Sequence, residues 1–214
     1  MGEKGQRTTK ARQYPCYARN VSNPPDPIPE LAQACLEYVR RALAFELDFS
    51  PETLPVLDHY VATVRASLSE RPELTPLVTR AAGAYFGEVV RAVIPGFWRL
   101  PSQNIHDWQL CCRQIYLWVN PIGVAYDALH AGTDHDGPRS ILRSAPEDRE
   151  FLERRLSTVP PVPAEQFTLF TTRLEVIEIA AEALSARLEE QGYSGLELGE
   201  DDYAAEVGAI SPLN

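Results

Sequence analysis

Hydrophobic and polar positions follow a helical period over most of the chain. Apolar residues recur every three or four positions in about six segments, which is the spacing of one face of an α-helix. These segments begin near Glu30, Ser50, Pro76, Asn120, Ser144 and Phe167. At Ser50, Thr75 and Asn120 a residue that can cap a helix precedes a proline, which is a typical helix start. The pattern therefore predicts a mainly α-helical protein.

The region after the third helical segment has the composition of strands. Phe97–Leu100 is short and ends at Pro101, and Trp108–Val119 is rich in residues that favour strands. Alternation along Trp108–Val119 would place Leu110 and Trp118 on one face and Cys111 and Val119 on the other. We predict an antiparallel hairpin of these two strands. The fold class is then α+β, mainly α, with about six helices packed on a short hairpin or small sheet.

Charge and proline content divide the chain into three parts. Residues 1–28 form a basic arm that ends in a proline-rich run, and we predict that this arm is flexible. Residues 29–192 hold the periodic segments and form one globular α-rich domain. Residues 193–214 are acidic and weakly patterned, so we predict an acidic C-terminal tail.

Two glycines interrupt the third helical segment on one side. Gly83 and Gly87 are four positions apart, and each costs about 1 kcal/mol of helix propensity. A close crossing by another helix or strand would explain both residues, and a ligand that approaches the backbone is the alternative. We favour the packing explanation.

The last helical segment, from Phe167 to Leu188, keeps its apolar spacing for three heptads. Such a stripe can form the seam of a dimeric coiled coil or close the core of a monomer. Further apolar residues widen the stripe, which favours the core. A homodimer through residues 167–188 remains the alternative.

Composition excludes several function classes. The net charge of −10 disfavours nucleic-acid binding by the folded part. No apolar run reaches the roughly 20 residues that span a bilayer, and no secretory signal opens the chain, so we predict a cytoplasmic protein without a membrane span. The four cysteines have neither disulfide nor zinc spacing and are expected to be free thiols.

The sequence contains no convergent catalytic motif. Phosphate-binding glycine loops, a nucleophile elbow and zinc-binding helix motifs are all missing, so we predict no cofactor, no metal and no catalytic residue. Asp58–His59 is expected to be a solvated surface pair, and His106–Asp107 a neighbouring pair without the oriented hydrogen bond of a catalytic dyad. Asp134–Asp136 is expected to be a hydrated turn.

Five residues around the predicted helix–hairpin junction are candidates for binding a ligand or a partner: Tyr85, Glu88, Trp98, Trp108 and Tyr116. Exposed aromatic residues in a rigid frame are common anchors of protein contacts. We expect Glu88 to lie at the surface. If it were buried, it would have to be paired or have a raised pKa.

The residues LDFSPETL at 47–54 and GAYFGEVV at 83–90, followed by Trp98 and Asn120–Pro121, resemble motifs of an uncharacterised bacterial domain family. The resemblance covers roughly residues 35–130. It implies a bacterial origin and a similar arrangement of helices before a short sheet, and it implies no activity.

Three functions follow as hypotheses. The first is a non-catalytic bacterial cytoplasmic protein that binds another protein, as an adaptor or an immunity protein does. The second is an enzyme or small-ligand receptor with a pocket between the 76–94 helix and the 97–119 strands, although the missing motifs argue against an enzyme. The third is a structural protein that self-assembles through the 167–188 helix.

Overall fold

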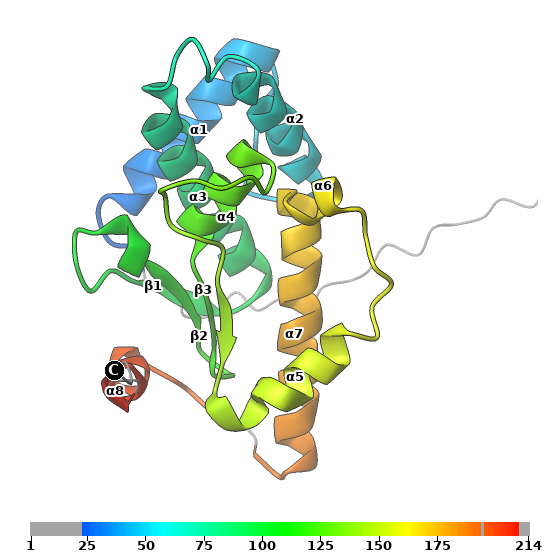
Figure 1. Cartoon of the computed structure of the whole chain (residues 1–214). Coiled ribbons are helices and arrows are strands. Elements are labelled where there is room, and N and C mark those ends of the chain that lie inside the picture. The colour runs from blue at the N-terminus through cyan, green and yellow to red at the C-terminus, as the bar shows by residue number, and fades with distance from the viewer. Residues whose placement is uncertain (1–22, 194, 210–214) are drawn as a thin grey trace, which may run out of the picture.

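The computed structural model describes residues 23–193 and 195–209 and confirms an α+β fold that is mainly helical (Figure 1). Within these residues eight α-helices accompany one four-stranded antiparallel sheet. The helices are α1 (Ile28–Leu43), α2 (Leu54–Arg65), α3 (Leu74–Val93), α4 (Pro121–His130), α5 (Arg149–Leu156), α6 (Ala164–Phe167), α7 (Phe170–Glu190) and α8 (Glu200–Ala209). Short 3-10 segments η1 (Pro51–Thr53), η2 (Ile105–Asp107) and η3 (Pro146–Asp148) precede α2, β2 and α5.

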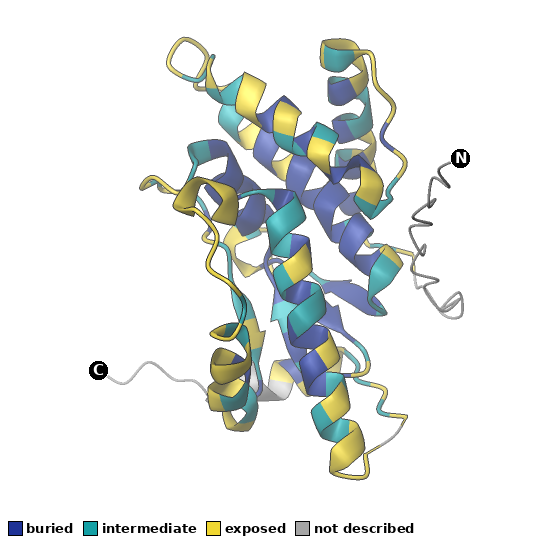
Figure 2. Ribbon diagram, turned by 90° about the vertical axis from the view of Figure 1, so that its right-hand side faces the viewer, coloured by how far each residue is buried: buried dark blue, intermediate teal, exposed yellow. Residues whose placement is uncertain are grey.

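Helix α3 lies at the centre of the helical layer and packs against α1 and α4. A Cβ atom at Gly83 would lie 2.7 Å from the Cα of Ile122, and one at Gly87 would lie 2.1 Å from the indole of Trp98. Both glycines therefore serve close packing, as we predicted. Figure 2 shows the consequence, with helices that are buried on their inner sides and exposed outside.

The sheet has the strand order β1 (Gly96–Arg99), β2 (Gln109–Cys112), β3 (Leu117–Val119) and β4 (Leu142–Ser144). Each strand is antiparallel to its neighbour, so the sheet is a meander. One row of directly opposed residues crosses all four strands: Phe97, Cys111, Trp118 and Arg143. Side chains in such a row share one face of the sheet.

The prediction of one strand over Trp108–Val119 is wrong. Residues 113–116 form a turn, so the segment is itself a hairpin of β2 and β3. The turn reverses the alternation, and Leu110 pairs with Val119 while Cys111 pairs with Trp118. The predicted grouping of Leu110 with Trp118 on one face is therefore also wrong, because a turn between two positions breaks the period of two.

Different elements pack on the two faces of the sheet. On the inner face, Leu110 and Val119 join the core formed with α1, α2, α3 and α4, while Cys112 and Leu117 pack with residues of α5 and α7. On the outer face, Phe97 and Cys111 are buried beneath Tyr203 of α8. This helix belongs to the segment that we predicted as an acidic tail. Its first three residues, Glu200, Asp201 and Asp202, are exposed, whereas Tyr203 is 1% exposed.

Helix α7 begins at a cap that comes from a distant part of the chain. The carboxylate of Asp58 in α2 accepts hydrogen bonds from the backbone N–H of Phe170 at 2.7 Å and from the hydroxyl of Thr171 at 2.9 Å. Burial raises the pKa of Asp58, and these hydrogen bonds oppose the rise. Asp58 is thus no solvated surface residue, although its neighbour His59 is exposed.

The apolar stripe of α7 is part of the core of a single copy. Seven residues are buried there: Phe170, Leu174, Ile177, Ala180, Ala181, Ala183 and Leu184. Because α2, α4 and α5 cover this side, a homodimer through the same stripe would have to displace them. In the described part of the chain, no helix is both long and apolar enough to cross a membrane.

Candidate functional site

The five predicted site residues do not form one site, although the structure does bring Glu88 and Trp98 into contact. Tyr85 is fully buried and contacts the segment that precedes α2. Its hydroxyl accepts from the backbone N–H of Phe49 at 3.0 Å and lies 2.8 Å from the hydroxyl of Thr53. The ring stacks on Phe49 with 5.0 Å between centroids. Tyr85 therefore fixes the segment before α2 to α3.

Glu88 is mostly buried, contrary to our expectation of surface exposure, and it is paired. Its side chain is 20% exposed and meets the guanidinium of Arg91, which is 2% exposed, at 2.8 Å. The same carboxylate accepts from the indole N–H of Trp98 at 2.7 Å. Arg91 also donates to the carbonyl of Gly96 at 3.3 Å. This cluster attaches β1 to α3.

The space between α3 and the strands is therefore filled by side chains. The indole of Trp98 lies against Gly87, and Leu110 and Val119 complete the same core. Trp108 is 5% exposed, and its N–H donates to the carbonyl of Ser102 at 3.1 Å. The structure gives no support to a ligand pocket in the position that the second hypothesis assigns to it.

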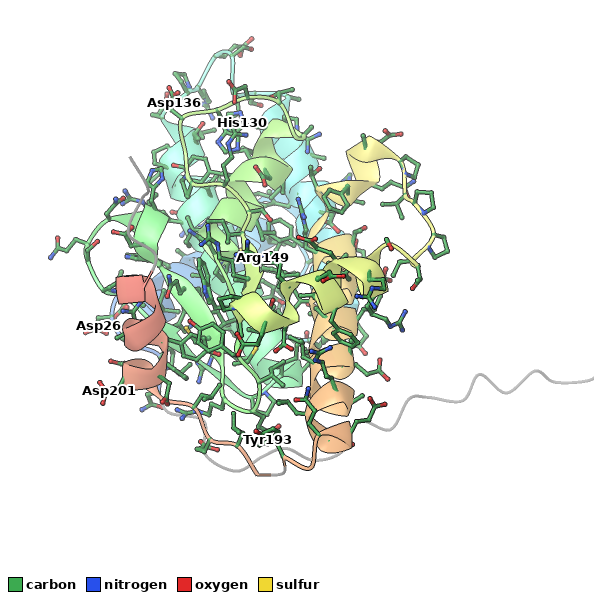
Figure 3. The ribbon with its side chains drawn as sticks, turned by 60° about the horizontal axis from the view of Figure 1, so that its bottom comes forward. Asp26, His130, Asp136, Arg149, Tyr193 and Asp201 are labelled. Atoms are coloured by element: carbon green, nitrogen blue, oxygen red, sulfur yellow. The ribbon has the colours of Figure 1, made fainter. Side chains whose placement is uncertain are left out.

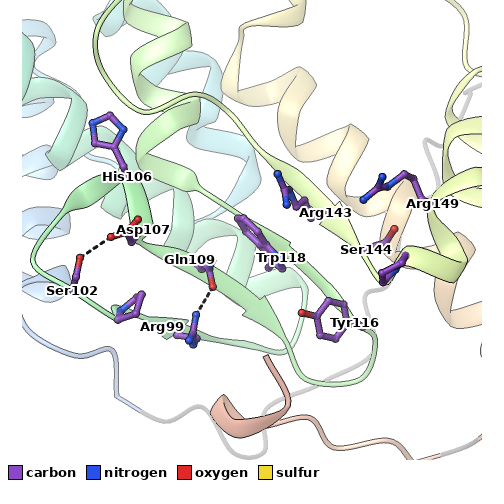
Figure 4. A pocket seen from close by; sticks show the side chains of 12 residues that line it. Arg99, Ser102, His106, Asp107, Gln109, Tyr116, Trp118, Arg143, Ser144 and Arg149 are labelled. Carbon is purple, nitrogen blue, oxygen red and sulfur yellow. Dashed lines mark hydrogen bonds between the residues drawn. The ribbon is translucent and has the colours of Figure 1, made fainter. Parts of the chain in front are cut away.

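A groove of about 560 Å³ lies instead on the outer face of the sheet (Figure 4). Tyr116, the fifth predicted residue, lines one end of it. The other lining residues come from all four strands and the adjoining segments: Arg99, Pro101, Ser102, His106, Asp107, Gln109, Trp118, Arg143, Ser144, Pro146 and Arg149. Its volume is in the range of sites that bind small molecules.

Three arginines give the groove its charge. Arg99 donates to the side-chain oxygen of Gln109 at 3.0 Å, and Arg143 lies with its guanidinium 5.8 Å from the centre of the Trp118 ring. Arg149, at the start of α5, is exposed. Among the described residues, neither Arg143 nor Arg149 forms an ion pair. In a chain with net charge −10, this is a local excess of positive charge.

The polar end of the groove has no catalytic arrangement. The hydroxyl of Ser102 donates to Asp107 at 2.8 Å, so the carboxylate orients a serine rather than a histidine. The backbone N–H of His106 donates to the Asn104 side chain, and the His106 ring is exposed. The arrangement can bind polar groups, and neither of these two hydrogen bonds joins the serine hydroxyl to a histidine base.

A second polar cluster lies at the end of the molecule away from Tyr193 and Asp201, where Figure 3 labels His130 and Asp136. The prediction that Asp134–Asp136 is a hydrated turn is wrong for His135, whose side chain is 3% exposed and lies 2.9 Å from Asp127. The backbone N–H of Ser140 also donates to Asp127. This cluster holds the loop against α4, and none of its residues lines the groove on the outer face of the sheet.

The cysteines in the described residues are chemically inert. Cys35, Cys111 and Cys112 are buried free thiols, and Cys16 lies outside these residues. Burial raises the pKa of all three, in Cys112 to about 12, so the reactive thiolate is suppressed near neutral pH. Within residues 23–193 and 195–209, no group of three histidine, cysteine or acidic side chains could hold a metal ion.

Comparison of the chain with protein-family models, with curated proteins and with solved structures gives no significant match in any of the three. The resemblance of residues 35–130 to a bacterial domain family therefore stays a prediction.

Sequence reasoning missed Arg99, Arg143 and Arg149 as a group. They lie in β1, in β4 and at the start of α5, and only the pairing of strands brings them to one face. The strand β4 was not predicted at all, because Leu142–Ser144 is only three residues long. The sequence offers a partial signal for Arg143 alone, since residues 139–143 hold two bases and no acid, whereas Arg149 is flanked by Glu147, Asp148 and Glu150.

Proposed function

We propose that this chain is a non-catalytic bacterial cytoplasmic protein that binds an acidic segment of another protein in the outer-face groove. The observation that carries the proposal is the convergence of Arg99, Arg143 and Arg149 on one groove of an acidic protein. The guanidinium group of arginine binds carboxylates well because it offers several hydrogen-bond donors in one fixed plane. Bases on one face also attract acidic partners by long-range steering.

The shape of the groove supports a segment of chain as the ligand. Its lining begins at β1, crosses β2 and β3, and ends at η3 and α5, so it follows the width of the sheet. Arg143 and Arg149 lie on one side of Trp118, with Arg99 and Gln109 on the other (Figure 4). Charged groups at both sides of an aromatic floor suit several carboxylates spaced along a peptide. Buried free thiols agree with a reducing compartment.

The test uses defined peptides of opposite charge, an acetylated and amidated hexaglutamate and a hexalysine of the same length. We expect hexaglutamate to bind the full chain, measured by calorimetry and by shifts of backbone amide signals, and hexalysine not to bind. Rising salt should weaken binding, because exposed charge pairs are screened.

The variant Arg143→Gln/Arg149→Gln should weaken hexaglutamate binding by roughly tenfold, which corresponds to about 1.4 kcal/mol. Arg40→Gln/Arg80→Gln is the matched control, since it removes the same charge from two exposed positions in α1 and α3. Equal weakening by both variants, or no binding of hexaglutamate to the wild-type chain, would overturn the proposal.

A further inference from the structure

The outer face of the sheet already holds one acidic segment of the chain itself. Helix α8 begins Glu200-Asp201-Asp202-Tyr203, and Tyr203 is its buried anchor. The Tyr203 ring stacks on Tyr116 with 4.5 Å between centroids and meets Phe97 edge-on at 5.8 Å. Its hydroxyl donates to the carbonyl of Cys112 at 2.7 Å. The sheet thus binds an aromatic ring whose neighbours are acidic.

The lead-in to α8 is held by an arginine. The carboxylate of Glu197 lies 3.3 Å from the guanidinium of Arg113, and the backbone N–H of Leu198 donates to the carbonyl of Arg113 at 2.7 Å. The docked segment therefore combines an acid on an arginine, a backbone hydrogen bond and a ring on the aromatic face. These three contacts define how this sheet holds a peptide segment.

The groove repeats the same groups beside α8. In the row across the sheet, Phe97 and Cys111 are covered, whereas Trp118 is half-buried and Arg143 is exposed. Arg143 and Arg149 stand where carboxylates could reach them, and the Trp118 ring forms the floor (Figure 4). Tyr116 has Tyr203 stacked on it and lines the groove as well, so the two regions are continuous.

We infer that the groove takes an acidic partner segment that carries an aromatic side chain, with the ring on Trp118 and the carboxylates on Arg143 and Arg149. This inference rests on the proposed function and adds a specificity to it. An aromatic ring matches the floor better than an aliphatic one, because aromatic pairs gain energy beyond the area that they bury. The occupant is another protein rather than the α8 of a second copy, since Tyr203 is already buried in its own sheet.

The test compares two acetylated and amidated peptides of equal charge, Glu-Asp-Asp-Tyr-Glu and Glu-Asp-Asp-Ala-Glu. We expect the tyrosine peptide to bind the wild-type chain roughly five- to tenfold more tightly. In a proton–nitrogen spectrum, the indole N–H signal of Trp118 should shift. The signal of Trp98 should stay, because its N–H donates to Glu88 between β1 and α3, away from the groove.

Two variants test whether the preference for the tyrosine peptide depends on the Trp118 ring. Trp118→Leu should remove the preference for the tyrosine peptide, and Trp118→Phe should keep most of it. If both peptides bind equally through the arginines, the inference fails and the proposed function stands. If neither peptide binds, both fail. If the tyrosine preference survives Trp118→Leu, the peptide is displacing α8, and the inference is overturned. If binding makes the chain dimerise in a sedimentation experiment, a second copy fills the groove, and the inference is overturned as well.

Discussion

Removing the carboxylate of Glu88 should destabilise the fold strongly. The side chain pairs with the buried guanidinium of Arg91 at 2.8 Å and accepts from the indole of Trp98 at 2.7 Å. Breaking a buried ion pair by removing one partner typically costs about 3–5 kcal/mol. Because the Glu88 side chain is 20% exposed, water can partly replace its carboxylate as a partner of Arg91. We therefore expect the lower end of that range, about 3 kcal/mol, for Glu88→Ala.

The variant Glu88→Gln separates the two interactions. An amide oxygen can still accept from Trp98, but the charge opposite Arg91 is lost, so we expect a loss of about 1–2 kcal/mol. For a chain of this size, 1 kcal/mol lowers the melting temperature by about 2–4 °C, so Glu88→Ala should melt roughly 6–12 °C lower. Urea unfolding should show a lower midpoint at an unchanged slope.

The matched control is Glu182→Ala, which removes an exposed glutamate from α7 and should change stability by no more than about 0.5 kcal/mol. Neither substitution touches the outer-face groove, so folded Glu88→Gln should bind hexaglutamate as the wild type does. If Glu88→Ala were as stable as Glu182→Ala and yet bound the peptide poorly, Glu88 would be a ligand-binding residue and our structural interpretation would be refuted.

Three further predictions concern packing and capping. Gly83→Ala should lower the free energy of unfolding by about 1–2 kcal/mol, because overpacking against the backbone of α4 costs more than the gain in helix propensity. The control is Gly199→Ala, which should be near neutral in urea unfolding because a Cβ there meets only open space and the end of one side chain. Asp58→Ala should lower the free energy of unfolding by about 1–2 kcal/mol, because the cap of α7 is lost. Asp58→Asn should lower it less, since burial already disfavours the charge of the carboxylate, and equal losses of stability in calorimetry would contradict this. Tyr203→Phe should cost about 1–3 kcal/mol and raise hydrogen exchange in the β2–β3 turn, and unchanged exchange there would count against the role of the hydroxyl.

Local patterns predicted the helices well because their signals are contained in short windows. The apolar spacing and the cap at Asn120, whose side chain accepts from the N–H of Gly123 at 2.9 Å, both depend on residues within one turn. The glycines of α3 were also informative, since a small residue on a helix face has few explanations other than close approach. The fold class followed from these signals.

The sheet and the groove could not be predicted in the same way. A turn at residues 113–116 inverts the alternation of all later positions, and no proline or glycine marks it. The burial of Glu88 depends on Trp98, ten positions further along the chain, and the burial of Tyr203 depends on β1 and the β2–β3 turn. Pairing of distant strands decides which arginines share a face, and periodicity within one segment carries no information about it.

Acidification should weaken the fold through His130. Burial is the main cause that lowers the pKa of this histidine, and the neighbouring His135, Arg139 and Arg65 lower it further, while Asp127 opposes them. The unfolded chain, with an ordinary histidine pKa of about 6.5, then binds a proton that the folded state resists. Stability contributed by neutral His130 is thus present above about pH 6.5 and is lost as the pH falls towards the lowered pKa of the folded state.

We expect His130→Gln to reduce the loss of unfolding free energy between pH 7.5 and 5.5 in urea titrations, and His59→Gln, at an exposed position in α2, to leave it unchanged. Asp58 has a raised pKa, so its protonation favours the folded state and acts with the opposite sign, but it is present in both wild type and His130→Gln and therefore cancels in the comparison. An identical pH dependence in wild type and His130→Gln would show that the lowered pKa of His130 does not contribute to stability.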